Sequence, residues 1–135
     1  MGKAESSRRW VLVVEDDELD ACLLVNLLQE CDPNLAIEVV STAVEGLRRV
    51  RKRQYDLVIS DFRLPGMNGL SFLKKAKKIR ATMRGILLTG YPGKELEAQV
   101  IHHGVCTYLS KSVGTPTLIK VMREALLLHE SAISI

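Results

Sequence analysis

The sequence predicts an α/β fold in which a mostly parallel sheet is covered by helices on both faces. Short apolar runs alternate with longer segments whose apolar residues recur at helical spacing. Several of these runs lack polar alternation, which is typical of strands buried on both sides. Hydrophobic residues make up 47% of the 135 residues and aromatic residues only 4%, so the core is expected to be aliphatic. These observations favour one doubly wound domain at 10–130, between a disordered N-terminal extension at 1–9 and a C-terminal tail at 131–135.

Five apolar runs are the candidate strands. The runs at 11–14, 57–59 and 86–88 are continuous and predict central strands. The run at 37–40 is weaker and predicts a strand nearer the edge, and the run at 106–109 predicts a short fifth strand. The patterns alone do not give the strand order. The flavodoxin-like order 2-1-3-4-5 is one of the two common solutions for such sheets.

A helical pattern follows each of these runs. In every one, apolar residues three or four positions apart predict the face that packs on the sheet. The predicted buried faces are Leu24, Leu27, Leu28 and Cys31; Val44, Leu47 and Val50; Phe72, Leu73, Ala76 and Ile79; Leu96, Val100 and Ile101; and Leu118, Met122, Ala125 and Leu126.

Capping residues predict three of the helix ends. Thr42 stands three residues before Glu45, which is the spacing of a capping box. Gly104 is placed to end the fourth helix as a C-terminal cap. Thr115 followed by Pro116 predicts an N-cap and the first helical residue of the fifth helix.

Polar residues follow the apolar runs at the edge of the sheet where sites of such folds lie. The acidic segment 15–18 follows the first run, Asp61 the third and Thr89 the fourth, and Lys111 comes shortly after the fifth. Alone, the acidic segment would be explained by a helix N-terminus. Together with Asp61 and Lys111 it predicts converging carboxylates, which repel one another unless a cation neutralises them.

Phosphoryl transfer is the chemistry that suits this collection. Oxygen ligands without nearby His or Cys favour Mg²⁺ over zinc. A lysine and a threonine hydroxyl can hold phosphoryl oxygens, and an aspartate can itself be the nucleophile. Catalysis in such a site is mainly positioning and charge neutralisation.

Four segments resemble those of response-regulator receiver domains. They are the strand and acidic cluster at 11–18, the segment 55–69 around Asp61 with its proline and glycine four and eight residues later, the strand end 86–90, and residues 108–111. The resemblance runs from about residue 10 to about residue 128. Each motif is weak alone, but four in the right order, each at a strand end, are specific.

The resemblance implies a role for each site residue. Asp61 is the phosphoacceptor, supplied by a sensor histidine kinase or a phosphotransfer protein. Thr89 and Lys111 bind phosphoryl oxygens, and Thr89 and Tyr108 form the switch. The implied Mg²⁺ ligands are Glu15, Asp16, Asp61 and the backbone carbonyl of Arg63. An alternative register makes Asp16 and Asp17 the acidic pair; Glu15 and Asp16 are preferred because the strand directly precedes them.

One residue departs from the family pattern. Receivers usually have a proline after the lysine, joined by a cis peptide bond, whereas here Ser112 follows Lys111. A non-proline cis bond costs about 3 kcal/mol, so this bond is expected to be trans. A displaced or more mobile Lys111 loop is the expected consequence.

Three functions are weighed against these residues. The first is a phosphorylatable switch rather than an enzyme, limited to self-phosphorylation from small donors and autodephosphorylation. Its partner surface is the face of the fourth helix, fifth strand and fifth helix, where a homodimer could also form. The second is a phosphorylation-independent interaction module, which only Ser112 favours. The third, a flavin- or nucleotide-binding protein, lacks the Gly-rich loop it needs after the first strand.

Composition bears on the location of the protein and on the ligands it can bind. With no bilayer-length apolar run or secretory pattern, a cytoplasmic protein without a membrane partner is expected. Net charge is only +3, and no aromatics interleave the basic clusters at 48–53 and 74–80, so a solvated face is favoured over a nucleic-acid patch. Three cysteines match no zinc spacing and are expected to be small buried thiols. The histidines, likewise without metal spacing, are expected at the surface; they are His102, His103 and His129.

Overall fold

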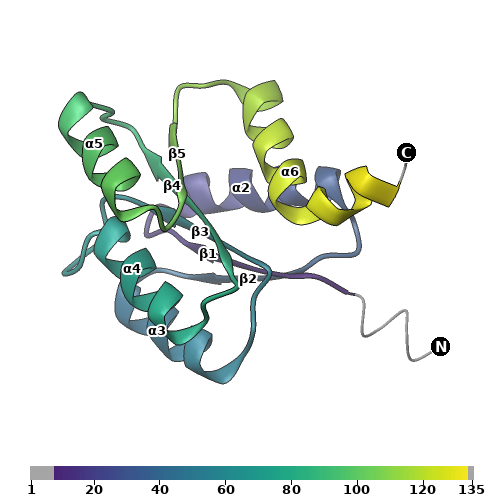
Figure 1. Cartoon of the computed structure of the whole chain (residues 1–135), viewed down its shortest axis with the longest axis horizontal. Helices are drawn as coiled ribbons and strands as arrows, with labels where there is room; N and C mark the ends of the chain where they lie inside the picture. Colours follow the sequence, from purple (N-terminus) through teal and green to yellow (C-terminus); the bar gives the residue numbers. More distant parts are fainter. Residues whose placement is uncertain (1–7, 134–135) are drawn as a thin grey trace.

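The computed structural model contains a five-stranded parallel sheet in the order β2-β1-β3-β4-β5, as Figure 1 shows. It describes the backbone of residues 8–133 and the side chains of residues 8–126. The predicted extension and tail therefore lie mostly outside the described residues. The elements in chain order are β1 (Trp10–Val14), α2 (Glu18–Cys31), β2 (Ala36–Val40), α3 (Ala43–Lys52), β3 (Leu57–Asp61), α4 (Gly69–Ile79), β4 (Arg84–Thr89), α5 (Lys94–His103), β5 (Thr107–Ser110) and α6 (Thr115–Ile133).

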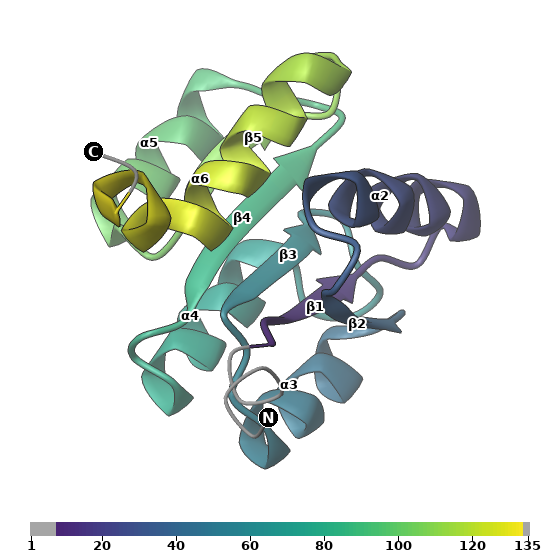
Figure 2. The same cartoon turned by 90° about the vertical axis from the view of Figure 1, so that its right-hand side faces the viewer.

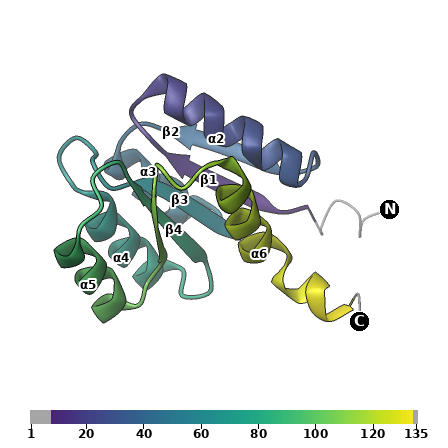
Figure 3. The same cartoon turned by 90° about the horizontal axis from the view of Figure 1, so that it is seen from above.

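Helices cover both faces of the sheet, so the doubly wound fold with order 2-1-3-4-5 is confirmed. Helices α2 and α6 lie on one face, and α3, α4 and α5 lie on the other (Figures 2 and 3). Each face has its own core, one built around α2 and α6 and the other around α3 and α4. Continuous apolar strands are required for this arrangement because both sides of each central strand must be buried.

Burial follows the position of each strand in the sheet. Every residue of β3 is buried, and so are four of the five residues of β1. Strand β2 lies at one edge, as its weaker apolar pattern predicted, and Val39 there is 43% exposed. Strand β5 lies at the other edge and begins at Thr107, one residue later than predicted.

Three predicted core positions are wrong, because the helices turn other residues toward the sheet. Val44 is 58% exposed, Ile101 73% and Ile79 37%. In α3 the small residues Ala43 and Gly46 complete the buried face instead, and at Gly46 this lets the helix lie close to Phe72 of α4 and Val14 of β1. In α5, which covers the edge of the sheet, only Val100 is buried.

The caps agree with the sequence at the end of α5, agree in part at the start of α3 and differ at the start of α6. The Thr42 hydroxyl accepts from the Glu45 backbone N–H, but the Glu45 carboxylate pairs with arginines of α3 rather than completing a capping box. Gly104 ends α5 with a left-handed φ of 63°. At the start of α6 the carbonyl of Gly114 accepts from Leu118, so the cap lies one residue before the predicted Thr115.

The expectation of buried thiols fails for Cys22, which is exposed on α2, while Cys31 and Cys106 are half-buried. His102 and His103 are exposed as predicted, and the side chain of His129 lies outside the described residues. No helix in the described part of the chain is long and apolar enough to cross a membrane.

The two basic segments lie side by side, because α3 and α4 are neighbours on one face (Figure 1). Several of their cations bind the protein itself. Arg49 pairs with Glu38, Arg80 donates to the carbonyl of Val50, and Lys77 donates to that of Met83. These contacts agree with a charged outer face; the absence of nucleic-acid binding stays a prediction.

Candidate functional site at the carboxyl ends of the strands

The parallel register brings the predicted site residues to one edge of the sheet. Val14 pairs with Ser60 across β1 and β3, and Asp61 pairs with Leu88 across β3 and β4. The residues that follow these strands therefore emerge next to one another. Beyond β5, the backbone N–H of Lys111 donates to the carbonyl of Thr89 at 2.7 Å, which holds the lysine at the same edge.

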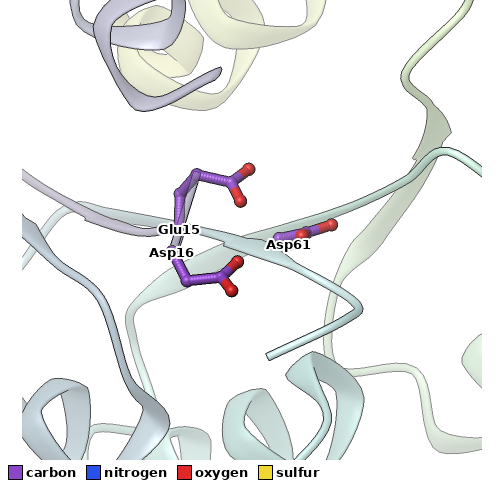
Figure 4. A group of neighbouring side chains, drawn as sticks. All are labelled: Glu15, Asp16 and Asp61. Atoms are coloured by element: carbon purple, nitrogen blue, oxygen red, sulfur yellow. The ribbon is translucent and has the colours of Figure 1, made fainter. Parts of the chain in front are cut away.

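Three carboxylates meet at this edge. Glu15, Asp16 and Asp61 each offer an oxygen within 4.8 Å of the others. Figure 4 shows Glu15 and Asp16 extending to opposite sides of the end of β1, with Asp61 beside them. Glu15 is 3% exposed and Asp61 8%, whereas Asp16 is exposed. Asp16 is thus the solvent-exposed member of the cluster, and Glu15 and Asp61 are its buried members.

Asp17, the alternative member of the acidic pair, caps helix α2 instead of joining the carboxylate cluster. It is the N-cap of α2, and its side chain accepts from the backbone N–H of Asp20 at 3.0 Å. Its own N–H lies 3.3 Å from a Glu15 oxygen. The acidic group that meets Asp61 therefore consists of Glu15 and Asp16, while Asp17 fixes the start of the helix.

Lys111 reaches this group although the following residue is serine. All described peptide bonds are trans, including the one before Ser112, as predicted. The Ser110 hydroxyl accepts from the Ser112 N–H at 3.1 Å and shapes the loop locally. The Lys111 Nζ lies 3.4 Å from an Asp61 oxygen and 3.1 Å from a Glu15 oxygen. The expected displacement of Lys111 away from the site is therefore not found.

The charges of the cluster are strongly coupled. Burial, reinforced by the nearby charge of Asp61, raises the pKa of Glu15 to about 7. Burial on its own lowers the pKa of Lys111, but hydrogen bonds to Asp20 and Glu15 outweigh it and raise this pKa. One lysine thus partly neutralises several carboxylates, and negative charge remains in excess.

Thr89 and Tyr108 lie on the side of β4 and β5. Thr89 is 1% exposed, and its hydroxyl oxygen accepts from the Tyr91 N–H at 3.1 Å. This bond uses a lone pair and leaves the hydroxyl proton available as a donor. The half-buried Tyr108 accepts through its hydroxyl from the N–H of Gly93, the N-cap of α5. Arg63 is exposed in the loop after β3, and its guanidinium stacks on the Tyr91 ring, 4.2 Å from the centroid.

Two further residues shape the site: Gly69, the glycine eight residues after Asp61 in the segment that carries the resemblance, and Asp20, which was not predicted from the sequence. Gly69 donates to the carbonyl of Phe62 at 2.7 Å, and a Cβ there would collide with the carbonyl oxygen of Asp61. The start of α4 can approach the end of β3 this closely only with glycine. Asp20 is the second, with an oxygen 2.8 Å from Lys111 Nζ.

The donor set fits a hard divalent cation. All three clustered side chains offer carboxylate oxygens, one of them from an exposed residue that leaves room for water and a phosphoryl group. Mg²⁺ prefers a few carboxylates with several remaining positions for water and phosphate oxygens. The residual negative charge and the raised pKa of Glu15 are the conflict that such an ion resolves.

Comparison with known proteins identifies the family. The model of the response regulator receiver domain matches residues 11–123. Relatives include the transcriptional regulatory protein ZraR of Escherichia coli O157:H7, 29% identical over 86% of this chain, and the two-component response regulator ARR10 of Arabidopsis thaliana, 34% identical over 76%. The match covers 26% and 18% of these two proteins, so the chain spans only a small part of their length.

Solved structures agree with this result. A CheY-like receiver domain from Methanospirillum hungatei JF-1 has a TM-score of 0.81 at 29% identity, over 93% of this chain and 98% of that one. The receiver domain of an HD domain-containing protein from Pseudomonas fluorescens Pf-5 has a TM-score of 0.77 at 29% identity, over 95% and 93%. With the family model matching most of its length, this chain belongs to the receiver domains of two-component response regulators.

Proposed function

We propose that the chain is a phosphoacceptor switch that takes a phosphoryl group on Asp61 in a Mg²⁺-dependent reaction. The observation that carries the proposal is the meeting of Glu15, Asp16 and Asp61 within 4.8 Å, with Lys111 Nζ 3.4 Å from Asp61. The donor is a sensor histidine kinase or a phosphotransfer protein, the partners with which receiver domains interact. Partner identity rests on family membership.

The reaction is a transfer between two nucleophiles. An Asp61 carboxylate oxygen attacks the phosphorus of the donor, the bond from phosphorus to the donor nitrogen or oxygen breaks, and the leaving group keeps the electron pair. An acyl phosphate on Asp61 results. Attack of water on the same phosphorus later releases inorganic phosphate and restores the carboxylate.

The described side chains supply positions and charge for this transfer. Lys111 holds a phosphoryl oxygen by its ammonium group, and the Thr89 hydroxyl donates to another. Glu15, Asp16, Asp61 and the Arg63 carbonyl would hold the ion, which when bound would neutralise charge on the phosphoryl oxygens.

Switching is expected to pass through Thr89 and Tyr108. If Thr89 turns its hydroxyl toward a phosphoryl group, its bond to the Tyr91 N–H at 3.1 Å changes. Tyr108 in turn holds Gly93 at the start of α5. We therefore place the partner surface, and any homodimer, on the face formed by α5, β5 and α6.

Mass spectrometry with a small donor tests the proposal. After incubation with acetyl phosphate and Mg²⁺, the wild type is expected to gain one phosphoryl group, and EDTA is expected to prevent the gain. Asp61→Asn should gain none. Asp56→Asn, at the opposite end of the sheet where its oxygen accepts from Trp10, is the matched control and should behave like the wild type. An adduct that forms equally in Asp61→Asn or in EDTA contradicts the proposal.

A further inference from the structure

Lys111 lies closer to Asp20 than to Asp61, the residue whose phosphoryl group it is expected to bind. Its Nζ lies 2.8 Å from Asp20 Oδ2, 3.1 Å from Glu15 Oε1 and 3.4 Å from Asp61 Oδ1. The contacts to Asp20 and Glu15 have hydrogen-bond geometry, whereas the contact to Asp61 is a longer ion pair. The ammonium group thus pairs with all three carboxylates but lies closer to Asp20 and Glu15 than to Asp61.

Asp20 is suited to hold the lysine but not the metal. It lies in the first turn of α2, which is fixed in place because the Asp20 N–H donates to the Asp17 cap. Its side chain is 45% exposed, and it is not part of the carboxylate group formed by Glu15, Asp16 and Asp61. Its contact in the site is therefore with Lys111.

The stem of Lys111 leaves the ammonium group room to turn. Lys111 borders a small cavity of about 90 Å³ between α2 and α6, which is lined by Glu15 and Asp20 and by the apolar residues Leu23, Leu24, Leu88 and Leu118. A lysine stem on an apolar surface keeps its charged end free to choose among acceptors. An ammonium has three protons, and two of them already point at Asp20 and Glu15.

We propose, building on the function proposed above, that Asp20 is a positioning residue that competes with the phosphoryl group for Lys111. While Asp61 is unmodified, Asp20 holds the ammonium on the α2 side. When Asp61 carries the phosphoryl group, the phosphoryl oxygens bind the Lys111 ammonium. The ion pair between Asp20 of α2 and Lys111 in the loop after β5 then breaks. Asp20 therefore weakens binding of the phosphoryl group.

Beryllofluoride, a stable mimic of the phosphoryl group, measures this competition. Asp20→Asn keeps the size of the side chain and removes its charge, so the mimic should bind about threefold more tightly, a modest gain because the ion pair is partly exposed. Asp20→Glu, which keeps the carboxylate, should stay near the wild type. Affinities are measured by calorimetry at saturating Mg²⁺.

Glu18→Gln is the matched control for the loss of one negative charge. Glu18 lies in the same turn, is exposed, and is two residues away, so it does not share a helix face with Asp20. Removing the Glu18 charge should leave the affinity for beryllofluoride unchanged. An unchanged or weaker affinity in Asp20→Asn overturns the proposal, as does an equal gain in Glu18→Gln, which would show a general charge effect.

A second measurement needs no phosphoryl mimic and so separates this proposal from the function on which it rests. In the metal-free protein, the NMR signals of the Lys111 ε-methylene should shift in Asp20→Asn and stay in place in Glu18→Gln. If the wild type binds no beryllofluoride, the proposed function fails, whereas the shift still tests whether Asp20 holds Lys111. A Lys111 signal unaffected by Asp20→Asn overturns the positioning role.

Discussion

Two glutamates on neighbouring strand segments, Glu15 after β1 and Glu38 in β2, differ in what surrounds them. Glu38 is paired with Arg49 at 3.1 Å and Arg53 at 3.9 Å, and it accepts a hydrogen bond from the Tyr55 hydroxyl. Burial raises the pKa of Glu38, but these hydrogen bonds outweigh burial and hold the pKa below its usual value. The pKa of Glu15 is instead raised to about 7, by burial and by the charge of Asp61.

The difference separates a carboxylate compensated by its neighbours from one that marks a candidate site. Around Glu38 three arginines, Arg48, Arg49 and Arg53, pair with two carboxylates, Glu38 and Glu45, so no negative charge remains in excess. At Glu15 one lysine is shared among carboxylates, and the excess negative charge needs a cation from outside the chain. Strained electrostatics of this kind marks candidate functional sites, while compensated networks also occur in purely structural regions.

The largest expected effect is on Mg²⁺ affinity, which should depend on the carboxylates around Glu15 and not on those around Glu38. Asp16→Asn should weaken Mg²⁺ affinity by at least about tenfold, because few protein oxygens hold the ion. Glu38→Gln removes a carboxylate of the compensated network and should leave the affinity unchanged. Titration calorimetry with MgCl₂ measures both. Equal affinity in Asp16→Asn and the wild type would mean that the metal lies elsewhere.

A second test removes the shared cation. Lys111→Met keeps an apolar stem and should destabilise the metal-free protein by about 1–2 kcal/mol, because Glu15 and Asp61 lose their compensating charge. Saturating Mg²⁺ should reduce this loss, since without the Lys111 ammonium beside them the carboxylates bind the ion more tightly in the variant than in the wild type, and tighter binding to the folded state adds more stability. Urea unfolding in EDTA and in Mg²⁺ gives both values. A loss of the same size in the two conditions argues against a shared role in neutralisation.

The third test concerns the pH dependence of the compensated network. Because the folded pKa of Glu38 is lowered, its contribution is present above the unfolded pKa and is lost as pH falls through the folded value. Glu38→Gln should therefore cost about 1 kcal/mol at neutral pH and less as the pH falls below about 4. Thermal unfolding of both proteins across this range measures the difference. A constant difference would contradict the assigned role of the ionised carboxylate.

The regions around Glu15 and Glu38 also show which features of the structure could be predicted from the sequence. Continuous apolar runs gave the buried strands, because a strand covered on both faces needs no polar alternation. The residues after those runs then located the acidic group, since parallel strands end at one edge. The compensated network was not predicted, because the pairing of Glu38 with Arg49 depends on how α3 packs on β2.

Failures of prediction have the same origin in tertiary packing. Helical spacing alone placed Ile101 in the core, but α5 lies at the edge of the sheet and leaves it exposed. Asp20 lies outside the acidic segment 15–18 and was not among the predicted site residues. Its contact with Lys111 joins residues 91 positions apart, and no local pattern encodes such a contact.

The smallest expected effect compares two cation–π pairs at opposite ends of the sheet. Arg63 stacks on Tyr91 at 4.2 Å, joining the loops after β3 and β4, whereas Arg53 stacks on Trp10 at 3.6 Å near the start of β1. We expect the first pair to flank the path by which water approaches Asp61 in line, and neither side chain carries a carboxylate or amide that could orient this water. Slow loss of the phosphoryl group is expected.

Replacing the pair measures this shielding. Arg63→Asn combined with Tyr91→Glu should lose the phosphoryl group about threefold faster in Mg²⁺, since an exposed cation–π contact is worth about 0.5–1 kcal/mol. Arg53→Asn breaks the pair at the other end and should decay like the wild type. The decay of the phosphorylated protein is followed by mass spectrometry. If the double variant decays no faster than the wild type, both side chains lie in solvent without effect on the water, and shielding by this pair is wrong.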